Sequence, residues 1–155
     1  MAKQNTDSFP KDRISVIEIN SICFGVDILK SREVIPLPKI TPVPNTKEFI
    51  VGIFNLRGEI YPLVDISTIL GLKPKSINNG DMVIILDGHD LTLGVLVDLI
   101  HGVQHLSAVQ IKPAHGIVSK KMEEFIVGVI IERSFEIYLL DVDHLFASAE
   151  LRTYV

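Results

Sequence analysis

The sequence predicts an all-β fold made of two related lobes, each resembling a small barrel. Short apolar runs typical of strands recur along the chain, and turn residues separate them at regular intervals. One unit also occurs twice, because residues 125–146 align with residues 49–70 without a gap, at an offset of 76 residues. Seven of these 22 positions are identical, where composition alone would give about one or two. The identities are Phe49/Phe125, Ile50/Ile126, Val51/Val127, Gly52/Gly128, Arg57/Arg133, Leu63/Leu139 and Asp65/Asp141.

The composition indicates a packed globular protein. The chain has 155 residues, of which 47% are hydrophobic and 22% charged, and each half alone is too small to bury a good core. The net charge of −4 and the lack of a long basic run argue against a nucleic-acid partner. The polar first dozen residues, 1–12, contain no apolar signal segment, so we expect a flexible tail on a cytoplasmic protein without direct membrane insertion.

The first lobe is predicted at about residues 13–72. Two strands, Ile14–Ile19 and Ile22–Ile28, flank a turn at Asn20-Ser21. Four prolines between Pro36 and Pro44 exclude a helix or a central strand, so this stretch is expected to be an extended surface connection. Residues 45–48 could cap a short helical turn.

The central unit, Phe49–Leu70, is predicted to be a strand, a tight turn and a second strand, followed by one helical turn. The turn places Arg57 at a loop tip, where a residue is presented to a partner rather than to the core. Asp65, at the end of the second strand, is interpreted as a helix cap.

The second lobe is predicted at about residues 81–148, after a polar junction at about 73–80, and this division leaves an exchange of strands between the lobes open. The expected elements are a hairpin of residues 81–86 and 91–99, a strand at 102–106, a long loop at 107–124 and the second copy of the central unit. Residues 147–155 are predicted to form a short terminal helix, with 149–155 outside the domain as a tail or short helix.

The standard motifs of active sites are missing: the sequence has no phosphate-binding glycine loop, nucleophile elbow, zinc-protease helix motif or CxxC pair. His101 and His105 would be neighbours on a helix, but Gly102 favours an extended segment, so no metal site and no cofactor are predicted. The single cysteine, Cys23, fits a reducing compartment and is interpreted as a small buried apolar residue.

Asp141 and Asp143 leave one alternative function open. With a histidine they could serve a small β-barrel enzyme or a metal-binding protein. The first copy of the repeat has Asp65 but Ser67 in the corresponding places, which favours a helix cap instead.

An ordered set of segments resembles the CheW family of bacterial chemotaxis coupling proteins. The resemblance covers about residues 13–149, and it predicts a CheW-like domain at 13–150. The segments that carry it are Phe24–Leu29, Arg32–Ile35, Gly52, Asn55–Gly58, Pro62–Asp65 and Leu93–Asp98.

The resemblance implies a fold, a function and a set of site residues. The fold is all-β, with two five-stranded Src-homology-type β-barrels packed around a shared core and short helical turns. The function is that of a non-catalytic adaptor between the cytoplasmic tips of methyl-accepting chemoreceptors and the regulatory domain of the histidine kinase CheA, recruited to the inner face of the membrane through the receptors. The receptor-binding positions implied by the resemblance are Arg57, Asn55, Gly58, Gly52, Glu33 and Ile28, and the kinase-binding positions are Gly94 and Val97.

Overall fold

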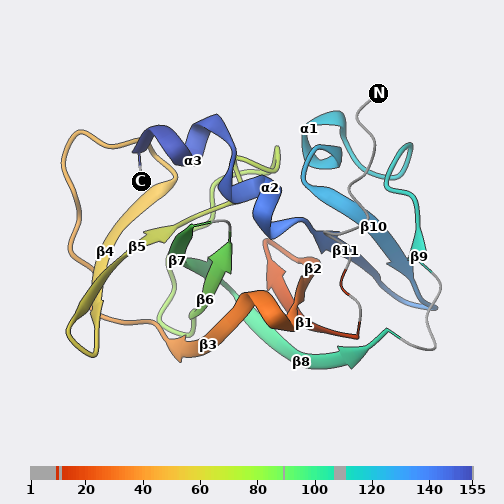
Figure 1. Cartoon of the computed structure of the whole chain (residues 1–155), viewed down its shortest axis with the longest axis horizontal. Coiled ribbons are helices and arrows are strands. Elements are labelled where there is room, and N and C mark those ends of the chain that lie inside the picture. The colour runs from red at the N-terminus through yellow and green to blue at the C-terminus, as the bar shows by residue number, and fades with distance from the viewer. Residues whose placement is uncertain (1–9, 11, 89, 107–110, 155) are drawn as a thin grey trace.

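The computed structural model describes residues 10, 12–88, 90–106 and 111–154, and within them the fold is dominated by strands (Figure 1). The strands are β1 (Arg13–Ile19), β2 (Ile22–Asp27), β3 (Ser31–Pro36), β4 (Ile50–Leu56), β5 (Glu59–Val64), β6 (Met82–Gly88), β7 (Leu91–Val97), β8 (Leu99–His105), β9 (Ile111–Lys112), β10 (Ile126–Ile131) and β11 (Glu136–Leu140). The helical elements are the 3₁₀ turn η2 (Ile28–Lys30) and the helices α1 (Lys120–Glu123), α2 (Val142–Phe146) and α3 (Ala149–Tyr154).

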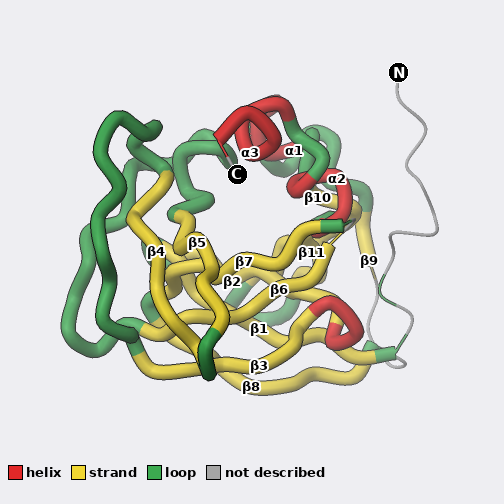
Figure 2. Tube along the Cα trace, turned by 60° about the vertical axis from the view of Figure 1, so that its left-hand side comes forward, coloured by secondary structure: helices red, strands yellow, loops and turns green. Residues whose placement is uncertain are grey.

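The strands form two sheets. Sheet A has six strands in the order β8-β1-β2-β11-β10-β9, and sheet B has five in the order β3-β6-β7-β5-β4. Sheet B lies at the left of Figure 1 and sheet A at the right, while α1, α2 and α3 run along one side of the strands (Figures 1 and 2). The predicted all-β class is confirmed, although the ladder of each sheet is open and the two-residue β9 gives sheet A a sixth strand.

The lobes exchange strands. Sheet B uses one continuous stretch of chain from β3 to β7, whereas sheet A combines β1 and β2 with β8 to β11. Residues 73–80 were expected to join the lobes, but they connect β5 to β6 within sheet B. The reason is that β1 and β2 pair with strands from the far end of the chain, including the parallel partner β11.

The sequence repeat is also a structural repeat. The β4–β5 and β10–β11 hairpins share their register, and each has a shift next to its first glycine, at Ile50/Gly52 and Ile126/Gly128. In each copy the backbone N–H of the aspartate that ends the hairpin donates to the carbonyl oxygen of the first phenylalanine. The two bonds, Asp65 N to Phe49 O and Asp141 N to Phe125 O, are both 2.8 Å long. Each copy then adds a parallel neighbour, β7 beside β5 and β2 beside β11.

A shared hydrophobic core joins the two sheets, as predicted. Its largest cluster includes Phe24 of sheet A, Ile84 of sheet B and Phe146 of α2, all fully or almost fully buried. Gly88 permits the close approach of α2 to β6, because an added Cβ would lie 2.7 Å from Cδ2 of Phe146. Two smaller hydrophobic clusters each form around one sheet, one with residues of sheet A such as Ile14 and Ile137, and the other with residues of sheet B such as Phe54 and Ile85.

Two predictions of local structure need correction, and a third is confirmed. Residues 45–48 form no helix; they are turn and irregular backbone, with Asn45 at φ 61°. The stretch 107–124 contains β9 and α1 and is not a single loop; its first four residues, 107–110, lie outside the described residues. The terminal helix is confirmed as α3, at residues 149–154.

The described helices are all short. None of them is long and apolar enough to cross a membrane.

Candidate functional site

The β4–β5 hairpin presents Arg57 at its tip, as the sequence predicted. Leu56 pairs with Glu59, so the turn consists of Arg57 and Gly58, whose φ angles are 51° and 86°. Two successive residues with positive φ are typical of a type I′ turn, in which glycine at the second position is favoured. Asn55 supports this turn by accepting a hydrogen bond from Gly58 N at 3.1 Å. The Arg57 side chain is 71% exposed.

Arg57 is paired with Glu33 of β3. Its two terminal nitrogens donate to the two carboxylate oxygens of Glu33 at 2.7 and 2.8 Å, which is the bidentate geometry that fixes both side chains. The hydrogen bonds from Arg57 lower the pKa of Glu33 below its ordinary value and raise the pKa of Arg57. The two residues of opposite charge that were predicted to bind a receptor therefore lie together.

This ion pair bridges the open side of sheet B. Strands β3 and β4 are the two edges of the sheet, and the ladder does not join them. Arg57–Glu33 spans the opening near the hairpin tip, and an isolated bridge between Thr41 and Ile53 spans it farther along, with both hydrogen bonds at 2.9 Å. Arg57 and Glu33 thus have a structural role in addition to the binding role predicted for them.

Arg32 of β3 connects to the adjacent strand β6 and, across the same opening, to β5. Its guanidinium donates to both oxygens of Asp87 on β6, at 3.1 and 2.9 Å, and to the hydroxyl of Tyr61 on β5 at 3.1 Å. Tyr61 in turn donates to Glu59. We call Arg57, Glu33, Arg32, Asp87 and Tyr61 the polar seam. Each arginine fork in it is bonded to a carboxylate of the same chain, which fixes the charged groups in position at the surface.

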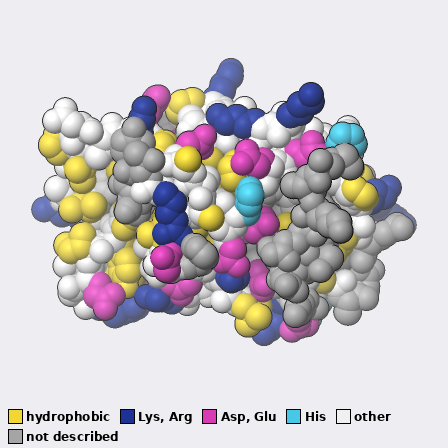
Figure 3. All heavy atoms as spheres, turned by 45° about the horizontal axis from the view of Figure 1, so that its top comes forward, with side chains coloured by type: hydrophobic (Ala, Val, Ile, Leu, Met, Phe, Trp, Pro, Cys, Tyr) yellow, Lys and Arg dark blue, Asp and Glu magenta, His cyan; other side chains and the backbone are white. Residues whose placement is uncertain are grey.

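Apolar surface flanks the polar seam. Ile60, which follows the turn, is 60% exposed, and Leu29 of η2 is 81% exposed. A hollow of about 240 Å³ lies beside the hairpin. Its lining residues are Lys39, Thr41, Ile53, Phe54, Asn55 and Ile60. Figure 3 shows hydrophobic side chains gathered at the sheet B end of the molecule, on its left. A partner could therefore bury apolar side chains next to the charged pair.

The other predicted site residues differ in exposure. Ile28 is half-buried on η2, immediately before β3. Gly52 is buried, and an added Cβ would lie 2.6 Å from both Ile40 Cγ2 and Thr41 O, so this glycine permits close packing of the chain that follows β3. Gly94 and Val97 are buried in β7, so neither can offer a side chain to a kinase at the surface.

The residues of the alternative enzyme or metal-site hypothesis have structural roles. Asp141 caps α2 by accepting from His144 N at 3.0 Å, as expected of a helix cap, and Asp143 pairs with Lys30 Nζ at 2.8 Å. His101 and His105 both lie in β8, which is extended as predicted. Cys23 is half-buried rather than fully buried, and its thiol lies near Glu18 and His101, within 4.8 Å between donor atoms.

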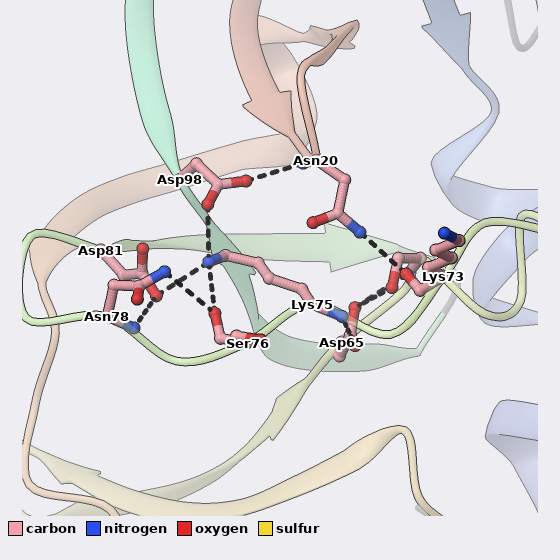
Figure 4. Close-up of polar contacts among 9 residues, drawn as sticks. Asn20, Asp65, Lys73, Lys75, Ser76, Asn78, Asp81 and Asp98 are labelled. Atoms are coloured by element: carbon pink, nitrogen blue, oxygen red, sulfur yellow. Dashed lines mark hydrogen bonds and ion pairs between the residues drawn. The ribbon is translucent and has the colours of Figure 1, made fainter.

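A buried lysine is the main site that sequence reasoning missed. The Lys75 side chain is 1% exposed, and its ammonium lies 2.8 Å from each of Asp81 and Asp98 (Figure 4). Burial would lower the pKa of Lys75, but the hydrogen bonds and charges of the two aspartates raise it. Asp65 accepts from Lys75 N at 2.8 Å, and Asn20 donates to Asp98 at 2.7 Å. A lysine within the polar stretch 73–80 gave no sequence signal, because such residues are normally solvated.

Comparison with known proteins shows what the chain is similar to. A family model described as "CheW-like domain" matches residues 13–150. The chain is 31% identical to a chemotaxis protein CheW of Klebsiella aerogenes, over 83% of this chain and 77% of that protein. It is also 31% identical to a chemotaxis protein CheW of Thermotoga maritima, over 91% of each. The crystal structure of the scaffolding protein TtCheW from Thermoanaerobacter tengcongensis superposes with a TM-score of 0.77 at 29% identity, covering 92% of this chain and 96% of that one.

Proposed function

Because the chain belongs to the CheW-like domain family, we propose that it couples the cytoplasmic tips of chemoreceptors to the histidine kinase CheA. The family places it among chemotaxis scaffolding proteins and not among enzymes. The observation that carries the proposal is the match of the family model to residues 13–150, which is almost the whole described chain.

We place the receptor contact at the polar seam and the hollow beside it. Arg57 and Glu33 are accessible, opposite in charge and held in one geometry, so a receptor side chain can pair with either of them and set the orientation of the complex. The hollow and Ile60 offer apolar surface to a helical receptor tip. Gly52, Asn55 and Gly58 shape the hairpin, and Ile28 lies on the element that precedes β3.

The kinase contact is proposed at the surface of a barrel end. Gly94 and Val97 lie on a central strand, so they would support such a surface from the interior and would not contact the kinase themselves. Recruitment to the inner face of the membrane would follow from receptor binding.

The proposal is tested by calorimetric titration of the full chain with the CheA regulatory domain and, separately, with a truncated receptor tip. We expect both to bind. Arg57→Ala should weaken receptor binding roughly tenfold or more and leave kinase binding unchanged, since truncation of a hot-spot arginine at the centre of an interface costs about 2 kcal/mol or more. Arg133→Ala is the matched control, because Arg133 occupies the same place in the second repeat and is exposed. The coupling function is wrong if the wild-type chain binds neither partner.

A further inference from the structure

Glu18, Cys23 and His101 form a cluster of three metal-ligand side chains on neighbouring strands of sheet A. Their donor atoms all lie within 4.8 Å of one another. Glu18 on β1 pairs directly with Cys23 on β2, so the two side chains share one face of the sheet. His101 comes from β8, the strand on the other side of β1.

A β-bulge brings His101 to this cluster. Gly102 pairs with Val16 and Ile100 pairs with Ile17, so His101 is the extra residue at the register shift and has no partner in β1. Gly102 follows it with φ 111°, a conformation that glycine adopts easily. Bulges re-aim side chains and are frequent next to functional sites. Here the bulge places the imidazole Nε2 3.0 Å from Glu18 Oε1.

The distances suit a tetrahedral divalent ion after small side-chain adjustments. With metal–donor bonds of about 2.0–2.3 Å, tetrahedral donors lie about 3.3–3.8 Å apart. The distances present are 3.0 Å from Glu18 Oε1 to His101 Nε2 and 3.9 Å from Glu18 Oε1 to Cys23 Sγ.

The surroundings leave room for a fourth ligand. A hollow of about 330 Å³ opens beside the cluster. Besides the three ligands, Val16, Val103, Phe135 and Ile137 line it. Apart from the three ligands, most of the lining is apolar, and the hollow opens to solvent beside the exposed His101, so a water molecule can reach the fourth position.

We propose that Glu18, Cys23 and His101 bind a divalent transition metal ion of the zinc class. Thiolate and imidazole donors select Zn²⁺ over Mg²⁺ or Ca²⁺, and three protein ligands leave the fourth position for water. Binding releases the proton of the Cys23 thiol, so the affinity falls as the pH falls.

The test is titration of the full chain with Co²⁺, followed by displacement with Zn²⁺. We expect one Co²⁺ per chain, with the thiolate-to-metal absorption band that oxygen and nitrogen ligands do not give. Cys23→Ala should abolish the band, and His101→Ala should weaken binding roughly tenfold or more. His105→Ala is the matched control, since His105 lies on the same strand, is 71% exposed and is not in the cluster.

Two results would overturn the assignment. One is the absence of a thiolate band in the wild-type chain. The other is equal weakening by His101→Ala and His105→Ala, which would indicate adventitious binding to surface histidines. Circular dichroism of each variant, together with its unfolding midpoint, distinguishes loss of ligands from loss of fold.

Discussion

Arg57 shows what can and what cannot be predicted for a single residue. Its place at a hairpin tip follows from local sequence, because a polar break containing glycine between two apolar runs predicts a tight turn. Its pairing with Glu33 depends on the curvature that brings the two edges of sheet B together, and local sequence carries no information about that. The family resemblance implied both residues, but not that they bind each other.

The pairing predicts the titration of Glu33. Because hydrogen bonds from Arg57 lower the pKa of Glu33, the pair stabilises the fold fully above the ordinary glutamate pKa, and the contribution disappears as the pH falls through the lowered value. We expect Arg57→Ala to move the midpoint of Glu33 upward, towards its ordinary value. NMR observation of the Glu33 side-chain carboxyl during a pH titration measures this. Arg133→Ala should leave the midpoint in place, and an unchanged midpoint in Arg57→Ala would contradict the pairing.

At the scale of elements, the repeat was the most informative sequence signal. An ungapped offset can persist only if both hairpins keep the same strand and turn lengths, and the matching registers and bulges confirm that they do. The turns themselves differ: Arg57 and Gly58 have positive φ, whereas Arg133 and Ser134 do not. The prediction that residues 45–48 cap a helical turn was wrong. The reason is that the residue types that cap helices also occur in irregular loops.

The contact of Gly52 with the chain after β3 gives a prediction for the β4–β5 element. Gly52→Ala places a Cβ against the backbone oxygen of Thr41, which cannot rotate away as a side chain can. We expect a loss of about 1–3 kcal/mol of unfolding free energy. Urea denaturation measures this loss, and faster hydrogen exchange at the Thr41 and Ile53 amides would locate it. Gly80→Ala is the control, since nothing lies within 4 Å of its added Cβ. Equal stability of the two variants would show that the edge is not tightly packed.

At the scale of the whole molecule, the exchange of strands between sheets could not be assigned from the sequence. Local patterns locate strands, but the parallel pairs β5–β7 and β2–β11 join segments whose order in space depends on the packing of the entire core.

The polar cluster around Lys75 could be recognised only once this topology was known. Lys75 and Asp81 lie between β5 and β6 of sheet B, Asn20 lies between β1 and β2 of sheet A, and Asp98 lies where the chain passes from β7 to β8. The cluster therefore links one sheet to the other.

Removal of the Lys75 charge should loosen this link. Lys75→Met leaves the buried Asp81 without its cation, and the loss of one partner of a buried pair typically costs about 3–5 kcal/mol. We expect Lys75→Met to lose most of that amount in urea denaturation at neutral pH, and Lys73→Met, at an exposed position nearby, to lose little.

The pKa of Lys75 is raised, so its contribution to the free energy of unfolding is fully present below the ordinary lysine pKa and is lost only as the pH rises through the higher folded value. The stability difference between wild type and Lys75→Met should therefore stay constant around neutral pH and shrink only in strongly alkaline solution. If Lys75→Met and Lys73→Met were equally stable at neutral pH, the two sheets would be held together by their shared apolar core alone.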